Sequence, residues 1–491
     1  MKRHLVLPLL FSGCIAAQSL GTFTATGNMT TPRQAHSAAA LADGRVLIAG
    51  GYRFTPGTRR AIPIDTAELY SPDLGTFGAT GRMTTIRYLH SATLLPNGKV
   101  LIAGGSSISD FSASLATAEL YDPSTGTFTP TGGMKSGRGG HSATLLANGK
   151  VLIAGGYDGQ AQFSSRCRCS FLASAELYDP VTKTFTATGD MTALVAGPIA
   201  TLLSDGKVWI TTGDDGPNVG AQLYDPKTGT FSDTGWMDAR SLIAATVSLL
   251  ATGQLLITLN VSECDFNSTS AGVYDVPTGA FRDTGLMAYP ICRPTGVTLS
   301  DGSVLITGGQ FRTVSRPAQV YDPVSAHFSL TGEMVDGRAS HTATLLRSGN
   351  VLIAGGCPDD CLNGTAASAE IYTPVLRKPP PLLLPAFGEK PEQGAILHTG
   401  TSDFASIGHP AIGGEVLEIY LTGLLAESVI PPQVTIGGRT AEVLFFGEAG
   451  GYHNLNQINV RVPYGTVSGN EVPVRVMYLG RPSNEVTIAV R

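Results

Sequence analysis

Residues 138–185 read RGGHSATLLANGKVLIAGGYDGQAQFSSRCRCSFLASAELYDPVTKTF, and this stretch decides the fold. Asn148-Gly149 lies between two apolar runs, which is a strong signal for a tight β-hairpin. Asp179-Pro180 is followed by polar residues and predicts a turn, because the proline ring presets φ. We therefore expect four short strands, named A to D in chain order.

The same pattern recurs along residues 18–374, so this part of the chain is a repeat. Strand C of each copy carries one tyrosine, and these are Tyr70, Tyr121, Tyr178, Tyr224, Tyr274, Tyr321 and Tyr372. Seven units of roughly 50 residues, with four strands each, predict a seven-bladed β-propeller. The units differ in length almost wholly between strands B and C, so we expect the B–C loops to form the variable face.

Six copies end in a strand D that carries Phe and is followed by Thr-Gly and Met, but the seventh copy stops at Tyr372. The missing element, GTFTATGNM, precedes the first copy at residues 21–29. A ring of blades hides its strand edges only if the last blade is complete. We therefore predict that residues 21–29 supply strand D of the seventh blade.

The units read close to HSATLL, NGKVLIAGG and AELYDP, and this pattern resembles the kelch repeat. More narrowly, it is similar to the kelch-type propeller of the galactose oxidase family. The resemblance covers residues 18–374 and is specific for the fold. It implies no single function, because kelch propellers include protein-binding platforms, sugar-acting enzymes and copper oxidases.

The N-terminal residues 1–17 carry Lys2 and Arg3 before a short apolar run, which predicts a signal peptide rather than a membrane span. The alternative is a lipoprotein-type signal acylated on Cys14, although Phe11 suits that signal poorly. We expect a secreted, periplasmic or cell-surface protein without a membrane span.

Residues 375–392 are rich in proline and predict a semi-rigid linker. Residues 393–491 do not repeat, and they contain alternating stretches such as VLEIYL at 416–421, which are typical of an immunoglobulin-like sandwich. This segment resembles a C-terminal domain attached to many secreted soil-bacterial proteins. The expected fold class is all-β, a seven-bladed kelch-type β-propeller followed by a small Ig-like β-sandwich.

Four copies begin strand A with Arg-x-x-His: Arg33/His36, Arg87/His90, Arg138/His141 and Arg338/His341. Strand A is innermost in a propeller, so these residues could form a cationic rim around the channel for an anionic or sugar ligand. The alternative is structural. The same four copies carry a glutamate before the strand C tyrosine, whereas the other three copies lose Arg, His and Glu together. Correlated loss within one chain indicates a physical pair.

A diglycine such as Gly155-Gly156 ends strand B in five copies. A phosphate-binding loop would need a following helix, and the sequence predicts none. The preferred interpretation is a close backbone approach in a packed sheet. Strands lie ~4.8 Å apart, so a guanidinium on strand A must cross strand B to reach a carboxylate on strand C. The hypothesis is that glycine leaves this path open, and that Arg138 passes over Gly155-Gly156 to Glu176.

A copper site of the galactose oxidase kind needs converging Tyr and His ligands and a tyrosine crosslinked to cysteine. Tyr452-His453 is the only adjacent Tyr-His pair, and it lies in the C-terminal segment. The resemblance therefore carries no catalytic residue, metal ligand or cofactor onto this chain.

The cysteines that follow Cys14 are even in number, which suggests disulfides in an exported chain. We predict the pairs Cys357–Cys361, within one B–C loop, and Cys264–Cys292, in loops of adjacent blades. Cys167-Arg-Cys169 would be strained as a bridge and offers too few ligands for zinc.

The charge composition limits the classes of molecule that the protein could bind. The net charge is -5 and the chain has no basic cluster, which argues against a nucleic-acid partner. We expect a monomeric binding protein that uses the B–C loop face for a carbohydrate or protein ligand. The alternative is a carbohydrate-active enzyme, either an oxidase or an isomerase, with its site on the same face.

Overall fold

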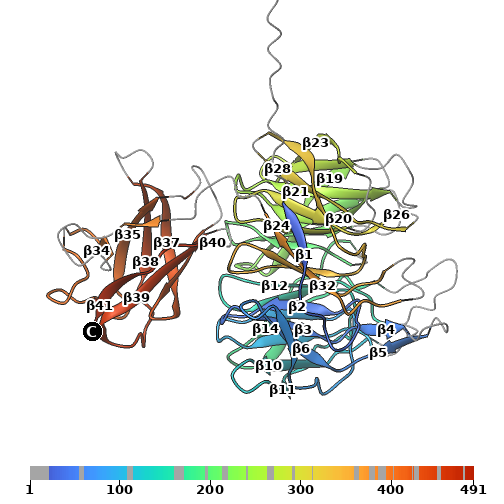
Figure 1. Ribbon diagram of the computed structural model, residues 1–491, viewed down its shortest axis with the longest axis horizontal. Coiled ribbons are helices and arrows are strands. Elements are labelled where there is room, and N and C mark those ends of the chain that lie inside the picture. The colour runs from blue at the N-terminus through green and yellow to red at the C-terminus, as the bar shows by residue number, and fades with distance from the viewer. Residues whose placement is uncertain are drawn as a thin grey trace, which may run out of the picture.

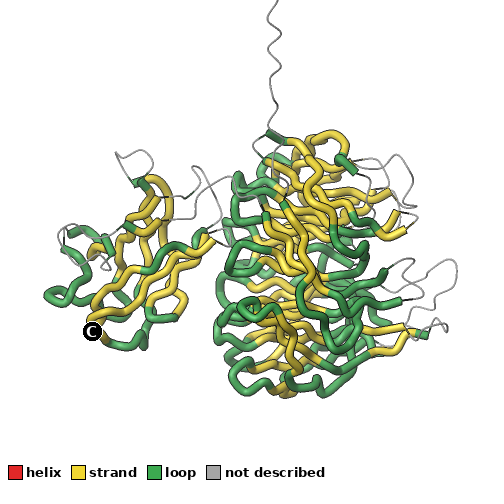
Figure 2. The backbone as a smooth tube through the Cα atoms, viewed as in Figure 1, coloured by secondary structure: helices red, strands yellow, loops and turns green. Residues whose placement is uncertain are grey.

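The computed structural model is all-β, and its described residues contain no helix. The structure describes residues 21–54, 60–107, 114–159, 171–193, 197–212, 219–238, 242–261, 270–289, 294–311, 313–323, 325–358, 364–374, 382–384, 394–401, 403–422, 424, 431–449, 455–478 and 481–491. In Figure 1 a propeller stands beside a smaller sandwich, and Figure 2 shows strands joined by loops throughout both. No helix of the described residues is long and apolar enough to cross a membrane.

Seven four-stranded antiparallel sheets form the propeller, as predicted. Blades 1 to 3 are β2 (Ser37–Ala40), β3 (Val46–Ala49), β6 (Ala67–Ser71) and β7 (Thr76–Ala79); β8 (Ser91–Leu94), β9 (Val100–Ala103), β10 (Ala118–Asp122) and β11 (Thr127–Pro130); and β12 (Ser142–Leu145), β13 (Val151–Ala154), β14 (Ala175–Asp179) and β15 (Thr184–Ala187). Blades 4 and 5 are β16 (Ala200–Leu202), β17 (Val208–Thr212), β18 (Val219–Asp225) and β19 (Thr230–Asp238); and β20 (Leu242–Leu249), β21 (Leu255–Val261), β22 (Ser270–Asp275) and β23 (Ala280–Leu286). Blades 6 and 7 are β24 (Thr295–Thr298), β25 (Val304–Thr307), β28 (Pro317–Asp322) and β29 (His327–Glu333); and β30 (Thr342–Leu345), β31 (Val351–Ala354), β32 (Ala369–Thr373) and β1 (Thr22–Ala25). The innermost strands of neighbouring blades contact one another in a closed circle.

The N-terminal strand closes the ring, which confirms the prediction for residues 21–29. β1 pairs antiparallel with β32, and Phe23 lies opposite Tyr372. Their rings lie 4.7 Å apart. The Thr26 hydroxyl, just past β1, is 2.9 Å from the Tyr70 hydroxyl of blade 1. The first and last parts of the propeller sequence therefore share one sheet and also join blade 7 to blade 1.

The strand B sequence Val-Leu-Ile-Ala is buried on both faces because it is sandwiched between neighbouring blades. In blade 1, Leu47 and Ala49 pack with Val100 and Ile102 of blade 2. Ile48, with the opposite orientation, packs in the cluster shared with blade 7. Successive side chains of a strand point to opposite faces, so a strand covered on both sides needs an unbroken apolar run.

The C-terminal segment forms a nine-stranded sheet that folds into a sandwich around one apolar core. Its strands are β33 (Leu382–Leu383), β34 (Ile396–His398), β35 (Val416–Thr422), β36 (Gln433–Ile436), β37 (Arg439–Glu448), β38 (Asn456–Arg461), β39 (Gly469–Tyr478), β40 (Arg481–Pro482) and β41 (Val486–Val490). Buried residues alternate with half-buried ones, as in β35. β33 pairs with β35 and ties the proline-rich segment to the sandwich. The immunoglobulin-like topology stays a prediction.

Two small hairpins extend the B–C loop face of the propeller. β4 (Tyr52–Phe54) pairs with β5 (Ala61–Pro63) in blade 1, and β26 (Gln310–Phe311) pairs with β27 (Thr313–Val314) in blade 6. The blade 1 hairpin also reaches a neighbour, because the Phe54 backbone N–H donates to the Thr365 hydroxyl of blade 7 at 2.9 Å.

Candidate functional site

In all four blades that carry both residues, the arginine before strand A forms a buried ion pair with the glutamate of strand C. The N···O distances are 2.8 Å for Arg33–Glu68, 2.7 Å for Arg87–Glu119, 3.1 Å for Arg138–Glu176 and 2.8 Å for Arg338–Glu370. Each pair lies within one blade. The predicted pairing is therefore confirmed.

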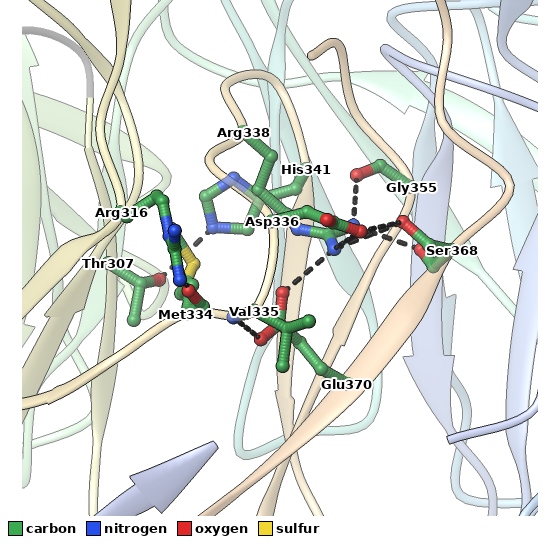
Figure 3. A network of polar contacts seen from close by, with 10 residues as sticks. All are labelled: Thr307, Arg316, Met334, Val335, Asp336, Arg338, His341, Gly355, Ser368 and Glu370. Carbon is green, nitrogen blue, oxygen red and sulfur yellow. Dashed lines mark hydrogen bonds and ion pairs between the residues drawn. The ribbon is translucent and has the colours of Figure 1, made fainter. Parts of the chain in front are cut away.

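Both members of the pair have further partners, as Figure 3 shows for blade 7. Arg338 also donates to the Gly355 carbonyl at 3.0 Å and to the Ser368 carbonyl at 2.9 Å. The Glu370 carboxylate accepts the Val335 backbone N–H at 2.7 Å. These charged groups are almost fully buried, and burial lowers the pKa of the equivalent Arg33, Arg87 and Arg138. The pair ties strands A, B and C together at one end of the blade.

The diglycine allows close backbone approach, as the sequence predicts. A Cβ on Gly50 would lie 2.5 Å from the Arg87 carbonyl oxygen and 2.7 Å from the His90 ring, both in the following blade. The Gly51 N–H donates to that same carbonyl at 2.9 Å. Both glycines also have positive φ, which favours glycine. Gly50 therefore makes room for the next blade, whereas a Cβ on Gly51 would lie 2.6 Å from the Gln34 carbonyl oxygen of its own blade. This confirms the close backbone approach, and no atom of Arg33 is among the nearest neighbours of either Cβ position.

This finding explains why blade 6 keeps its diglycine without an Arg–Glu pair. A Cβ on Gly308 would lie 2.4 Å from the Arg338 carbonyl oxygen of blade 7, and Gly309 donates to that oxygen at 2.9 Å. The diglycine of blade 6 thus accommodates the backbone of blade 7 at Arg338, and it does not depend on an Arg–Glu pair within blade 6. Blade 5 has Leu259-Asn260 in place of the diglycine, and its strand β21 continues to Val261.

Blades 4 and 6 replace the glutamate with a neutral residue that keeps part of its role. The Gln222 carbonyl accepts the Thr192 N–H at 3.0 Å, and the Gln319 carbonyl accepts the Tyr289 N–H at 3.3 Å. Both accepted N–H groups lie in the connection before strand A, where the glutamates accept theirs. Without an arginine, an amide satisfies the position with no buried charge, which accounts for the correlated loss.

The four histidines bridge neighbouring blades. His36 Nε2 is hydrogen-bonded to Thr342 of blade 7 at 3.0 Å, and His90 Nε2 to Ser37 of blade 1 at 2.7 Å. His141 and His341 likewise bond Ser91 and Thr307 of the preceding blade. Burial lowers the pKa of His36, His141 and His341 to about 3, with the neighbouring arginine adding to the shift. These imidazoles are neutral at pH 7 and do not form a cationic rim.

Acid should therefore weaken the propeller. Between pH 6.5 and about 3 the unfolded imidazoles bind protons that the folded ones do not, so the free energy of unfolding falls as pH drops through this window. We expect the urea midpoint to decrease steadily below pH 6.5, and His141→Gln to show a shallower decrease. An identical pH slope in the variant would contradict this assignment.

The same strand ends present a second set of residues, which we call the rim. The residue two before each histidine and the residue after each diglycine exchange both backbone hydrogen bonds: Gln34 with Tyr52, Tyr88 with Ser106, Gly139 with Tyr157 and Ala339 with Cys357. Side chains of such a pair lie on one face of the ribbon. The frame is constant, but the rim side chains differ from blade to blade.

Aromatic rings gather at the rim of blades 1 to 3. The Tyr52 ring lies 5.3 Å from that of Tyr88 and 5.5 Å from that of Phe54, edge to face in both cases. Tyr157 covers Gly139, where a Cβ would lie 2.7 Å from its ring. Burial raises the pKa of Tyr157, and the nearby Tyr88 adds to the shift.

Gln34 completes the rim. Its side chain is 1% exposed, and its amide nitrogen has no hydrogen-bond partner among the described residues. The next residue, Ala35, adopts a φ of 51°, and Leu89 and Ser340 repeat this left-handed conformation at the same place in blades 2 and 7. The Leu89 N–H donates to the Ala35 carbonyl at 3.1 Å, so the ring of blades holds the conformation in place.

Several predicted features lie wholly or partly outside the described residues. Cys357 takes part in a disulfide bond, but Cys361, Cys264 and Cys292 are not described, so both predicted pairings stay predictions. Tyr452-His453 and Cys167-Arg-Cys169 are not described either. Within the described part of the chain, no three His, Cys, Asp or Glu side chains gather as metal ligands.

Comparison with known proteins supports the propeller class. The kelch motif matches residues 138–192. Galactose oxidase from Gibberella zeae is 30% identical over 106 residues, which is 21% of this chain and 16% of that protein. The spermatocyte protein spe-26 of Caenorhabditis elegans is 31% identical over 136 residues, or 27% of this chain and 22% of that protein. The fold and the repeat define a kelch-type seven-bladed β-propeller.

A solved structure of a fungal alcohol oxidase of the AA5 family, in complex with copper, resembles the whole chain. Its TM-score is 0.57 at 16% identity, and the match covers 96% of this chain and 99% of that one. The likeness concerns the fold alone. The aligned parts of the curated relatives span less than a quarter of each relative, so their activities are not carried over.

Sequence reasoning missed the rim because each of its residue types is unremarkable alone. A signal was nevertheless present, since the position after the five diglycines reads Tyr, Ser, Tyr, Gln and Cys within an otherwise constant frame. Variation inside a constant frame marks positions that the repeat does not need for its own packing.

Proposed function

We propose that this chain is an exported binding protein whose ligand, a carbohydrate or a protein segment, sits at the rim of the B–C loop face. The buried amide nitrogen of Gln34, beside the Tyr52–Tyr88 ring pair, has no hydrogen-bond partner among the described residues, and this observation carries the proposal. A buried donor left unpaired costs about 1–3 kcal/mol, which a ligand acceptor would recover. The Arg-x-x-His residues do not face this ligand. They stabilise the rim indirectly, through ion pairs within blades and histidine hydrogen bonds between blades.

The test combines a glycan array and a pull-down with two variants. Gln34→Leu should weaken binding while leaving the melting temperature equal or higher, because it removes an unpaired buried donor. Gln433→Leu, an exposed glutamine of the sandwich, is the matched control and should change neither. Unchanged binding by Gln34→Leu would place the ligand elsewhere.

A second candidate is an oxidase of simple sugars or alcohols, favoured by the matches to galactose oxidase and to the fungal alcohol oxidase. The described residues do not fit the copper site of that family. The four propeller histidines direct Nε2 to serine or threonine hydroxyls of the preceding blade, and no three His, Cys, Asp or Glu side chains gather as metal ligands among the described residues. Bound copper together with peroxide release from alcohols would select the oxidase.

A further inference from the structure

Three large apolar side chains project from the C-terminal sandwich on two loops. Ile412 is 54% exposed, Tyr464 is 76% exposed and Val467 is 75% exposed. We call these three residues the end patch. Comparably exposed apolar residues of the propeller, Leu74 and Val181, each lie singly at a turn of one blade.

The two loops of the end patch are in direct contact. A Cβ on Gly414 would lie 2.3 Å from the Tyr464 hydroxyl, and one on Gly413 would lie 3.5 Å from the Tyr464 ring. The ring therefore rests against a backbone without side chains, and its remaining surface is open. Gly414 also donates to the Val462 carbonyl at 2.9 Å, just before the second loop.

An ionic clasp holds the first loop in shape. Glu415 accepts the Ile412 N–H at 3.0 Å, and its other oxygen bonds His398 Nδ1. His398 Nε2 bonds the His409 carbonyl at 2.9 Å. Burial alone lowers the pKa of His398, but these hydrogen bonds to Glu415 and His409 raise it above its ordinary value. These hydrogen bonds thus fix the backbone conformation of the loop that carries Ile412.

A cation lies beside the patch. The Arg439 guanidinium is 3.7 Å from the position of a Cβ on Gly465, the residue that follows Tyr464. Arg439 is exposed, and no ion pair of this residue is found in the described part of the chain. The patch therefore combines aliphatic side chains, one amphipathic ring and a free guanidinium.

We propose that the end patch docks on the surface of a lipid bilayer that contains anionic headgroups. A stable protein interface takes about 20–30 residues a side with matched shape, and this patch is far smaller. Lipid needs no shape match, because acyl chains fill the space around a few apolar side chains. Tyrosine suits the boundary between headgroup and hydrocarbon, and arginine suits the phosphates. This activity is independent of the rim.

The experiment is co-sedimentation of the full chain with phosphatidylcholine vesicles, with and without phosphatidylglycerol. The chain carries Cys14→Ser, which removes any acylation at that position. We expect binding to anionic vesicles that weakens with salt. The double variant Tyr464→Ser/Val467→Asn should lower the vesicle partition coefficient at least about tenfold, since each CH₂ group buried in the bilayer raises that coefficient about fourfold. Arg439→Gln should lose about fivefold, and only on anionic vesicles.

The matched control is Leu74→Asn/Val181→Asn, which removes equally exposed apolar residues from the propeller and should leave the partition unchanged. Unchanged melting temperatures will show that all variants fold. The proposal is overturned if the parent chain does not sediment with anionic vesicles, or if the patch variant sediments as the parent does. It is also overturned if the patch variant abolishes self-association instead of vesicle binding.

Discussion

Glu176→Gln should destabilise the propeller by about 3–5 kcal/mol, because it strands the buried charge of Arg138. Arg138 is fully buried and reaches Glu176 at 3.1 Å, so water cannot replace the lost carboxylate. Arg138→Met should cost a similar amount by stranding the carboxylate. The double variant should cost clearly less than the sum, since Gln222 of blade 4 already shows that an amide satisfies this position without an arginine.

The measurement is the free energy of unfolding in urea for the parent, both single variants and the double variant. Glu485→Gln is the control, because the Arg475–Glu485 pair is exposed and should contribute less than ~1 kcal/mol. Additive effects of the two propeller substitutions would mean that Arg138 and Glu176 do not act as a pair.

Deletion of residues 18–30 should lower the melting temperature of the propeller by at least about 10 °C. It removes β1, leaves the edge of β32 unpaired and takes away the ring that packs on Tyr372. It also removes the Thr26 hydroxyl that bonds Tyr70 of blade 1, so two blades lose a contact. An open sheet edge also invites pairing with another chain, so we expect aggregation on heating.

A peptide of residues 21–29 added in trans should restore part of the lost stability, because main-chain hydrogen bonds let an extended peptide complete a sheet. Deletion of residues 2–17 alone is the control and should leave the melting temperature unchanged. The assignment of β1 as the closing strand fails if both deletions melt alike.

Much of the propeller follows from short-range signals. Asn148-Gly149 sets a hairpin and Asp179-Pro180 a turn, whatever surrounds them. The repetition of these signals predicted the seven blades. The lack of a last strand after Tyr372 predicted the closing role of residues 21–29, because one unfinished copy and one spare strand can only be matched to each other. Counting within the sequence was enough here.

The Arg–Glu pair and its surroundings could be predicted from the sequence only in part. Its partners could be inferred because three blades lose Arg, His and Glu together. Close backbone approach at the diglycine could also be inferred, but its partner could not, because the atom that excludes a Cβ at Gly50 is the Arg87 carbonyl oxygen of the next blade. Every residue has a backbone carbonyl, so the sequence does not indicate which carbonyl approaches the glycine. That is known only from the packing of the blades.

The sequence by itself determined the strands, the number of blades, the closing strand and the ion pairs, since each depends on local pattern or on comparison between copies. Only the tertiary structure decided that the histidines are neutral bridges between blades, and that Gln34, Tyr52 and Tyr88 meet at one rim. The physical reason is distance along the chain. These contacts join separate blades, and packing of the ring alone sets which side chains are buried together and which remain free for a ligand.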